Sequence, residues 1–303
     1  MKTIIVFYKF SRLANAPDEI FKILEKYNKE YNKKYNKKYI LHFVNNKPVI
    51  LNFLLKKYKD ERVIVHFHNK YLKSSLLNKK NVKKIIHYHS EPSGVSLRVP
   101  VDYYRLVLNQ YHCTLKEYRG CSIVRNSFFN EKKIIFNKKI KIGYYPSTTI
   151  RHNKYYDKGY PETLQILYKI HKIFPNVIID VKHGISYSEC INRKRDCHII
   201  IDECKTGSFH KTTLEGLSLG CIVIVNINKL LEEIHKKLYG VKLPVINVNL
   251  KGLEYCLNIL LKTKKSVLEK MAIEKMNIFN KYWNNKIVSE EYFGIYKSIS
   301  NTF

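Results

Sequence analysis

The sequence predicts an α/β protein with two Rossmann-like domains, each built on a parallel sheet. Short apolar runs alternate with helical segments of about 10–15 residues, a rhythm typical of βαβ units. The rhythm restarts near residue 139 and produces a second half of similar size. Some runs, such as Cys221–Val225, are continuously apolar, as expected for parallel strands buried on both faces. We therefore expect domains over residues 1–138 and 139–283, followed by a final helical segment over 284–303.

The composition is that of a chain with a sizeable core in a reducing compartment. Its 303 residues are 45% hydrophobic, and no apolar run reaches the ~18 residues of a membrane span. The start, MKTIIVFYKF, lacks a small-residue cleavage site, so we interpret it as a strand and not as a signal peptide. Seven cysteines are widely spread without a C-x-x-C pair, which indicates neither a disulfide framework nor a zinc site. We expect a cytoplasmic location.

The net charge of +30 is unusual for a chain of this length. Residues 1–138 carry 29 basic and 10 acidic side chains, whereas residues 139–303 carry 26 and 15. An AT-rich genome would enrich lysine codons, although it would enrich glutamate as well, and glutamate is not abundant here. The alternative is a polyanion or an anionic membrane surface as partner of the basic first half. The composition leaves both explanations open.

The first half begins with a strand over Thr3–Tyr8 and a helix that starts at Pro17, where Asp18 and Glu19 suit the helix dipole. The further elements expected in this half are strands at Tyr39–Val44, Arg62–Phe67, Lys84–His89, Tyr103–Tyr111 and Cys121–Val124 and helices at Pro48–Tyr58 and Tyr71–Leu77.

A tyrosine repeat occupies the end of the first helix, in KYNKEYNKKYNKKY. Its tyrosines recur every four residues at positions 27, 31, 35 and 39, so at least the first three share one helix face. The simpler interpretation is a stripe that packs on the sheet. The functional alternative is an aromatic and basic surface for lipid headgroups or nucleic acid.

Histidines end two of the predicted strands. One strand ends in His66-Phe67-His68, and the next ends in His87-Tyr88-His89 followed by Ser90-Glu91-Pro92. The carboxyl ends of strands in an open α/β sheet line the ligand crevice. We therefore expect chemistry at this edge, although one or two of these histidines should simply alternate between core and solvent.

The second half repeats the pattern. Pro161 opens an amphipathic helix to about Ile173, with apolar residues at 164, 167, 170 and 173. The other expected elements are strands at Lys141–Tyr145, Val177–Val181, His198–Ile201 and Val245–Val248 and helices near Ser188 and over Leu250–Leu261, Val267–Trp283 and Ser289–Ser300.

The stretch Asp202–Asn226 combines a loop, a helix and a buried strand. Gly207 and Ser208 lie in the loop, the helix runs from about Lys211 to Leu219, and Gly220 ends it. Glu215 is the only carboxylate of this helix. On residue type alone, a helical glutamate is a solvated surface residue about as often as not; its neighbours favour a functional role.

Several fragments resemble one enzyme family. They are IGYYPST with the later DKG, NVIIDVKHG, RDCHIIIDECKTGSFHKTTLEGLSLGCIVIVN, VIVHFHN, IIHYHSEP and LVLNQYHCTLKEYRGCSIVRNSF. Together they span most of the chain, which resembles the GT-B glycosyltransferases and, among them, the large retaining group called glycosyltransferase family four. The resemblance implies two Rossmann-like domains that face each other across a cleft, with the last helix crossing back to the first domain. The first domain would then be the acceptor side, and the second would bind a nucleotide sugar.

The resemblance also assigns roles in donor binding. A diphosphate requires cations and backbone donors, which Arg151 and Lys158 and the loop Gly207, Ser208 and Phe209 before a helix N-terminus would supply. Glu215 matches the helix carboxylate that binds the ribose. The cations would also stabilise the charge that develops on the departing diphosphate. Neither a metal nor a cofactor is implied besides the nucleotide-diphosphate sugar, which is the donor substrate.

The catalytic candidates are His89 and Glu203. His89 matches the family's first-domain histidine near the sugar. The family's first glutamate would fall eight residues before Glu215, where this chain has Gly207, so Glu203 is the substitute if the loop bends. The segment FSRLANAP lacks the family's Gly-Gly loop, and the chain is short. A retaining, metal-independent transfer is what the resemblance implies.

Three functions therefore compete. The first is a glycosyltransferase that builds a glycan or glycolipid, peripheral at an anionic membrane or acting on another anionic acceptor. The second transfers sugar to modified bases of viral DNA, which it would have to reach by base flipping or otherwise. The third is a basic nucleic-acid-binding protein without enzyme activity, which would leave the donor-site residues unexplained.

Overall fold

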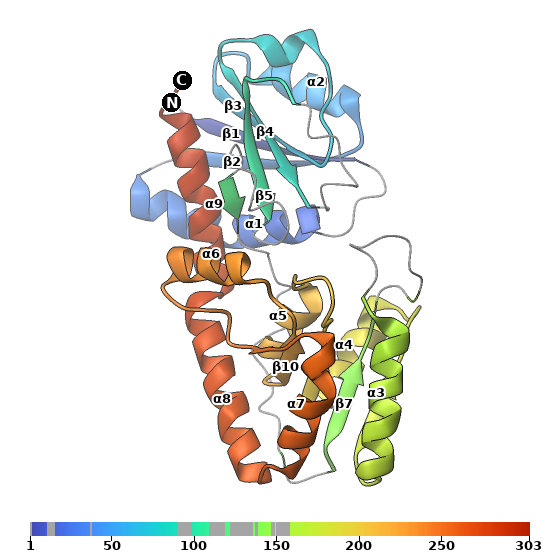
Figure 1. The fold of residues 1–303 in the computed structure, drawn as a ribbon. Helices are drawn as coiled ribbons and strands as arrows, with labels where there is room; N and C mark the ends of the chain where they lie inside the picture. The colour runs from blue at the N-terminus through green and yellow to red at the C-terminus, as the bar shows by residue number, and fades with distance from the viewer. Residues whose placement is uncertain are drawn as a thin grey trace. The chain divides into compact units, whose positions relative to one another are not determined.

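Two parallel sheets organise the protein, which is described from a computed structural model. The structure describes residues 2–10, 16–36, 38–89, 99–108, 119–121, 136, 139–146, 149 and 158–303. The chain divides into unit 1, which comprises Met1–Val124 and Asn284–Phe303, and unit 2, which comprises Arg125–Trp283. The predicted α/β class with two Rossmann-like parallel-sheet domains is confirmed (Figure 1). The predicted boundary after residue 138 stays a prediction, because most of residues 122–138 lie outside the described part.

The sheet of unit 1 has six strands in the order β2-β1-β3-β4-β5-β6, and every neighbouring pair is parallel. Its strands are β1 (Thr3–Lys9), β2 (Tyr39–Asn45), β3 (Arg62–His68), β4 (Val82–Tyr88), β5 (Tyr103–Leu108) and β6 (Arg119–Cys121). Its helices are α1 (Ala16–Tyr35), α2 (Pro48–Lys57), the 3-10 turn η1 (Ser75–Asn78) and α9 (Asn285–Ser300).

Alternation along the strands gives the unit 1 sheet two different faces. Ile5 and Ile64 point to a core that α1 and α9 complete, whereas Val6 and Val65 point to a core shared with α2. Helix α9 belongs to unit 1 because it packs beside α1 and β3 (Figure 1). The two ends of the chain also meet there, since the hydroxyls of Thr3 and Ser300 lie 3.0 Å apart.

The tyrosine repeat is mainly a packing device. Tyr31 is buried, and its ring stacks on that of Phe293 in α9 with centroids 4.2 Å apart. Tyr27 and Tyr35 pack at the border of the same core, and Tyr39 lies on β2. The stripe therefore contacts α9 as well as the sheet, and its burial favours the simpler interpretation.

The predicted helix at Tyr71–Leu77 is wrong, because only the short η1 forms there. Asn69 adopts a left-handed φ of 60° just after β3, which turns the chain away from a helical path. Tyr71 and Leu72 then lie in an irregular segment and pack against the core as individual side chains.

The sheet of unit 2 has five parallel strands in the order β11-β10-β9-β7-β8. Its strands are β7 (Lys141–Tyr144), β8 (Ile178–Val181), β9 (Ile199–Ile201), β10 (Ile222–Val225) and β11 (Ile246–Asn247). Its helices are α3 (Tyr160–Ile173), α4 (Tyr187–Arg195), α5 (Lys211–Ser218), α6 (Lys229–Tyr239), α7 (Leu250–Lys262) and α8 (Lys265–Tyr282). Helices α3 and α7 pack together, and α5 packs on β9, β10 and α8.

Helix α6 has no counterpart among the sequence-based predictions, although it carries clear end signals. The Asn228 side chain accepts a hydrogen bond from the backbone N–H of Leu231, and Gly240 ends the helix with a φ of +74°. Within the described part of the chain, no helix has both the length and the apolar character required to cross a bilayer.

Candidate functional site

The candidate site of unit 2 lies where β9 ends and α5 begins. Asp202 follows β9 and accepts hydrogen bonds from the His210 backbone N–H and the Thr213 hydroxyl, both at 2.7 Å. His210 Nδ1 lies 3.3 Å from the other oxygen of Asp202. Burial opposes ionisation of Asp202, but the charge and hydrogen bond of His210 and the nearby Lys158 outweigh it and lower the pKa of this carboxyl. Asp202 therefore fixes the start of α5 as a buried anion.

Glu203, a predicted catalytic residue, lies fully buried within its own loop. It accepts hydrogen bonds from the backbone N–H groups of Lys205 at 2.9 Å and Thr206 at 2.8 Å and from the Thr206 hydroxyl at 2.5 Å. A longer bond of 3.4 Å comes from the Ser208 N–H. The carboxylate thus holds the loop closed between β9 and α5.

The loop residues Gly207, Ser208 and Phe209 differ in their surroundings. Gly207 has a left-handed φ of +81°, and its carbonyl accepts hydrogen bonds from the Asn228 N–H at 2.9 Å and the Asn228 side chain at 3.0 Å. Ser208 is buried, and its hydroxyl oxygen has no hydrogen-bond partner among the described residues. Phe209 is buried edge-to-face against His235 with centroids 5.2 Å apart. Of the three residues, only Ser208 has a side chain with an unused polar group.

Glu215 is 4% exposed, so the interpretation as a solvated helix residue is wrong. Its Oε2 lies 2.5 Å from the Lys194 ammonium, and its Oε1 accepts a hydrogen bond of 3.1 Å from the Tyr187 hydroxyl. Lys194 is itself buried and also donates to the Thr212 hydroxyl at 3.1 Å. Burial acts to lower the pKa of Lys194, but the attraction of Glu215 prevails and raises it.

Sequence reasoning missed Lys194 and Tyr187, both of which lie on α4. A signal existed, because residues 187, 191 and 194 share one face of a helix, and Ile191 on that face is buried. A lysine at a core-facing position next to a neighbouring helix with a single carboxylate predicts an ion pair. What the sequence could not reveal is that α4 and α5 are neighbours.

Of the two cationic side chains predicted to bind the diphosphate, only Lys158 lies in the described part of the chain. Arg151 lies outside the described residues, so its role stays a prediction. Lys158 is half-buried and close enough to Asp202 to lower the pKa of that carboxyl. It precedes Gly159, which has a φ of +68° and caps α3, and the Lys205 side chain lies next to Gly159. The structure therefore brings Lys158 to the loop that contains Glu203 and Gly207.

His89, the other predicted catalytic residue, belongs to unit 1 and follows β4. Its backbone N–H donates to the Asn69 side chain at 2.6 Å, and its Nε2 lies 2.8 Å from Nδ1 of His68. Desolvation lowers the pKa of His89 to about 3, although part of its surface remains accessible. The side chain is therefore a neutral imidazole at physiological pH.

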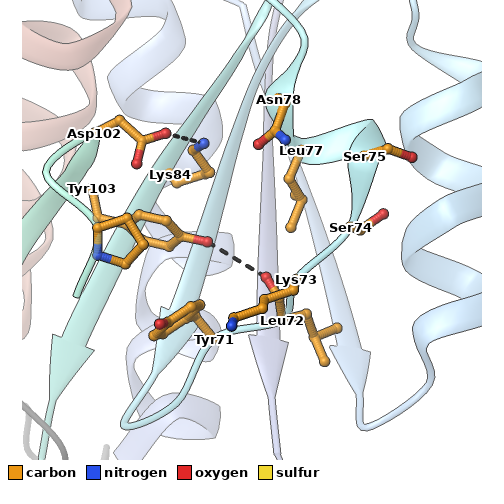
Figure 2. A pocket seen from close by; sticks show the side chains of 11 residues that line it. Tyr71, Leu72, Lys73, Ser74, Ser75, Leu77, Asn78, Lys84, Asp102 and Tyr103 are labelled. Atoms are coloured by element: carbon orange, nitrogen blue, oxygen red, sulfur yellow. Dashed lines mark hydrogen bonds and ion pairs between the residues drawn. The ribbon is translucent and has the colours of Figure 1, made fainter. Parts of the chain in front are cut away.

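A separate pocket of about 560 Å³ opens in unit 1 beside η1 (Figure 2). The Lys84 ammonium pairs with Asp102 on its rim, and the Tyr103 hydroxyl donates a long hydrogen bond of 3.5 Å to the Leu72 carbonyl. None of the predicted site residues lines this pocket. It is therefore distinct from the loop at the end of β9.

Comparison with solved structures places the fold among those of glycosyltransferases. A glycosyltransferase from Rickettsia africae ESF-5 matches with a TM-score of 0.58 and 15% identity over 98% of both chains. Anabaena HepE in complex with UDP-glucose matches with a TM-score of 0.57 and 9% identity over 98% of this chain and 100% of that one. AviGT4, a glycosyltransferase involved in avilamycin A biosynthesis, matches with a TM-score of 0.56 and 10% identity over 100% of this chain and 99% of that one.

These similarities extend over nearly the whole chain and show that it has the GT-B fold. No protein-family model matches the sequence, and no curated protein matches it either. At identities of 9–15%, the likeness concerns the fold, and membership of glycosyltransferase family four is not confirmed.

Proposed function

We propose that the protein is a glycosyltransferase that moves a sugar from a nucleotide-diphosphate donor to an acceptor. The observation that carries the proposal is the arrangement at the end of β9. There, Lys158, the loop closed by Glu203 and the buried Glu215 on α5 lie at the carboxyl edge of a parallel sheet in a GT-B fold. This edge is where open α/β sheets bind nucleotides. HepE, a protein of the same fold, was solved with UDP-glucose, which makes uridine nucleotides the first candidates.

Each of the donor's parts finds a partner of suitable chemistry. Lys158 and the unpartnered Ser208 hydroxyl suit the diphosphate, and Arg151 is proposed as a second cation. Each oxygen of Glu215 accepts one hydrogen bond, from Tyr187 and Lys194, and a carboxylate has about four acceptor positions, so Glu215 retains capacity for a ribose hydroxyl. The lysine and arginine would stabilise the charge on the departing diphosphate.

We assign different roles to the two catalytic candidates. His89, as a neutral imidazole, would hydrogen-bond a sugar hydroxyl and not act as a cation. Glu203 would act as a positioning residue, since its oxygens hold the backbone of the donor loop. We propose that transfer proceeds with retention and that it requires no metal ion at the diphosphate.

The exposed side chains of α2 suit an anionic membrane, which would then carry the acceptor. Val49, Ile50 and Phe53 are 80%, 41% and 62% exposed on this helix, and Lys47, Lys56 and Lys57 are exposed around them. Apolar side chains among lysines suit insertion between anionic headgroups, whereas DNA attracts the lysines only. We therefore propose a glycolipid or lipid-borne glycan as acceptor. Modified DNA and non-enzymatic nucleic-acid binding are the alternatives, and the salt series in the Discussion separates them.

The test is thermal stabilisation by a panel of nucleoside diphosphates, because a ligand that binds the folded state raises its melting temperature. We expect at least one nucleoside diphosphate to raise the melting temperature of the wild type. For Lys158→Ala and for Glu215→Gln, the same rise should require at least a tenfold higher concentration of that ligand. The exposed residues Lys270 and Glu233 provide the matched controls Lys270→Ala and Glu233→Gln. Equal stabilisation of all five proteins would show that the donor site lies elsewhere.

A further inference from the structure

Four histidines gather on one face of the unit 1 sheet, at the carboxyl ends of β3 and β4. The two strands are parallel neighbours, and their register sets His68 opposite His87. Since side chains alternate along a strand, His66 joins His68 on this face and His89 joins His87. Ring centroids lie 4.4 Å apart for His66 and His68 and 4.1 Å apart for His87 and His89.

This histidine cluster is enclosed. His66, His68 and His87 have no exposed surface, and the Phe7 ring lies against the first two at 4.9 and 5.5 Å. Tyr296 of α9 closes the cluster from the helix side with its hydroxyl 2.7 Å from His66 Nδ1. His89, the fourth histidine, is partly exposed.

The hydrogen bonds of the cluster leave buried nitrogens unused. His66 Nε2 lies 3.3 Å from His87 Nδ1, and His68 Nδ1 lies 2.8 Å from His89 Nε2. Among the described residues, His68 Nε2, His87 Nε2 and His89 Nδ1 have no hydrogen-bond partner. Buried polar atoms are nearly always satisfied, so three such atoms in one cluster indicate a missing ligand.

The protonation state suits a metal. His66, His68 and His87 are fully buried, and burial disfavours the charged form of an imidazole, which favours neutral rings. The neutral imidazole is the form that binds metal ions through its free nitrogen. A set of imidazoles suits zinc, copper, nickel or cobalt, whereas magnesium and calcium require oxygen ligands.

We propose that His66, His68 and His87 bind one divalent transition-metal ion of the zinc class. One nitrogen from each residue lies within 4.8 Å of the others, and zinc–nitrogen bonds of about 2.0–2.1 Å need these atoms about 3.4 Å apart. Small ring rotations close that difference. Tyr296 and His89 supply the outer contacts that metal-binding imidazoles require, because they hold the second nitrogens of His66 and His68.

The ion would join β3 to β4 and, through Tyr296, to α9. Three imidazoles leave a fourth position for water or another donor. The proposal does not rest on sugar transfer, although His89 is shared as the proposed sugar contact and as the outer contact of His68. It adds to the chain a ligand that the cysteine pattern of the sequence did not indicate.

The test is a titration of the whole chain, produced without an affinity histidine tag and stripped with a chelator. Cobalt(II) is the probe, because its visible absorption reports the number and type of ligands. We expect saturation at one cobalt per chain, a spectrum of nitrogen ligation, displacement by zinc and a higher melting temperature with zinc. Absence of saturable binding by the wild type would overturn the proposal, whatever the result of the nucleotide panel.

Variants then locate the site. We expect His68→Gln and His87→Gln each to weaken binding at least tenfold and Tyr296→Phe to weaken it about 10–100-fold through the lost outer contact. His42→Gln is the control, since His42 lies on β2 and is bonded to the Tyr58 hydroxyl at 3.0 Å. Undiminished cobalt affinity in folded His68→Gln and His87→Gln would assign the metal to another place and overturn the proposal. If those variants do not fold, Tyr296→Phe and the wild-type spectrum decide.

Discussion

At Glu215, a buried carboxylate shares its two oxygens between the Lys194 ammonium and the Tyr187 hydroxyl. Removing one partner of a buried ion pair leaves a charge without compensation, whereas removing both can be nearly neutral. We expect Lys194→Met to lower the free energy of unfolding by about 3–5 kcal/mol. The double variant Lys194→Met with Glu215→Leu should recover most of that loss. Urea denaturation followed by circular dichroism measures both.

Lys270→Met is the control for this comparison, because Lys270 is exposed on α8 and its loss should change the free energy of unfolding by less than about 0.5 kcal/mol. Additive losses in the double variant would contradict a direct pair between Lys194 and Glu215. The same double variant should lose nucleotide stabilisation, which separates the role of Glu215 in binding from its role in folding.

The lowered pKa of Asp202 makes the free energy of unfolding depend on pH. Its pKa is lowered in the folded chain, so the folded state binds fewer protons than the unfolded state near the usual aspartate pKa of about 3.9. Its contribution is therefore complete above that value and is lost as the pH falls below it. We expect Asp202→Asn to cost about 2 kcal/mol at pH 7, from weakened hydrogen bonds to a charged acceptor, and progressively less below about pH 4.

Denaturant unfolding of wild type and Asp202→Asn at several pH values between 7 and 3.5 measures this difference. Asp60, which is exposed, provides the control Asp60→Asn, whose difference from the wild type should stay small throughout. A gap between wild type and Asp202→Asn that stays constant down to pH 3.5 would refute the assigned role of the buried anion.

Helix α2 is the element on which the proposed membrane binding depends. Its exposed Val49, Ile50 and Phe53 occupy positions i, i+1 and i+4, so they share one side of the helix, while Leu51 and Leu55 face the core. We expect Phe53→Ser to reduce binding to vesicles with anionic lipid about 5–20-fold. Full burial of an aromatic ring contributes about 1.5–3 kcal/mol, and insertion at an interface provides only part of that free energy. Vesicle flotation measures the bound fraction.

Val101 supplies the control for that experiment. It is 95% exposed in the same unit but lies outside α2, so Val101→Ser should leave flotation unchanged. Equal losses for Phe53→Ser and Val101→Ser would show that general hydrophobicity, and not α2, drives binding.

The helices and strands show which parts of the fold can be predicted from the sequence. Apolar runs predicted the inner strands because a strand buried on both faces leaves a local signature, and α3 was visible from its apolar spacing. Helix α6 was missed although Asn228 and Gly240 mark its ends and Leu231, Ile234 and Leu238 lie between them at helical spacing. Contacts across elements, such as Lys194 with Glu215 or His68 with His87, depend on which elements are neighbours and in what register. No local pattern encodes that information.

The distribution of charge belongs to the whole molecule. Residues 1–138 hold 29 basic and 10 acidic side chains, an excess that would favour anionic membranes and DNA alike as partners. The two partners differ in what remains when salt screens the charges. Binding to duplex DNA is dominated by counterion release, so its affinity falls by orders of magnitude between 50 and 200 mM salt when several phosphates are contacted.

Insertion of apolar side chains depends little on salt, so a membrane-binding protein keeps part of its affinity when charges are screened. We expect binding to anionic vesicles to weaken about tenfold between 50 and 300 mM salt and then to level off, and Phe53→Ser to lower the remaining affinity by the same 5–20-fold. Binding to duplex DNA should be weaker than vesicle binding at every salt concentration and should vanish at high salt. Fluorescence anisotropy with DNA and flotation with vesicles over the same salt series measure the two affinities. Tight DNA binding by a protein that nucleoside diphosphates also stabilise would instead favour sugar transfer to DNA. Tight DNA binding without any stabilisation by nucleoside diphosphates would favour the non-enzymatic alternative.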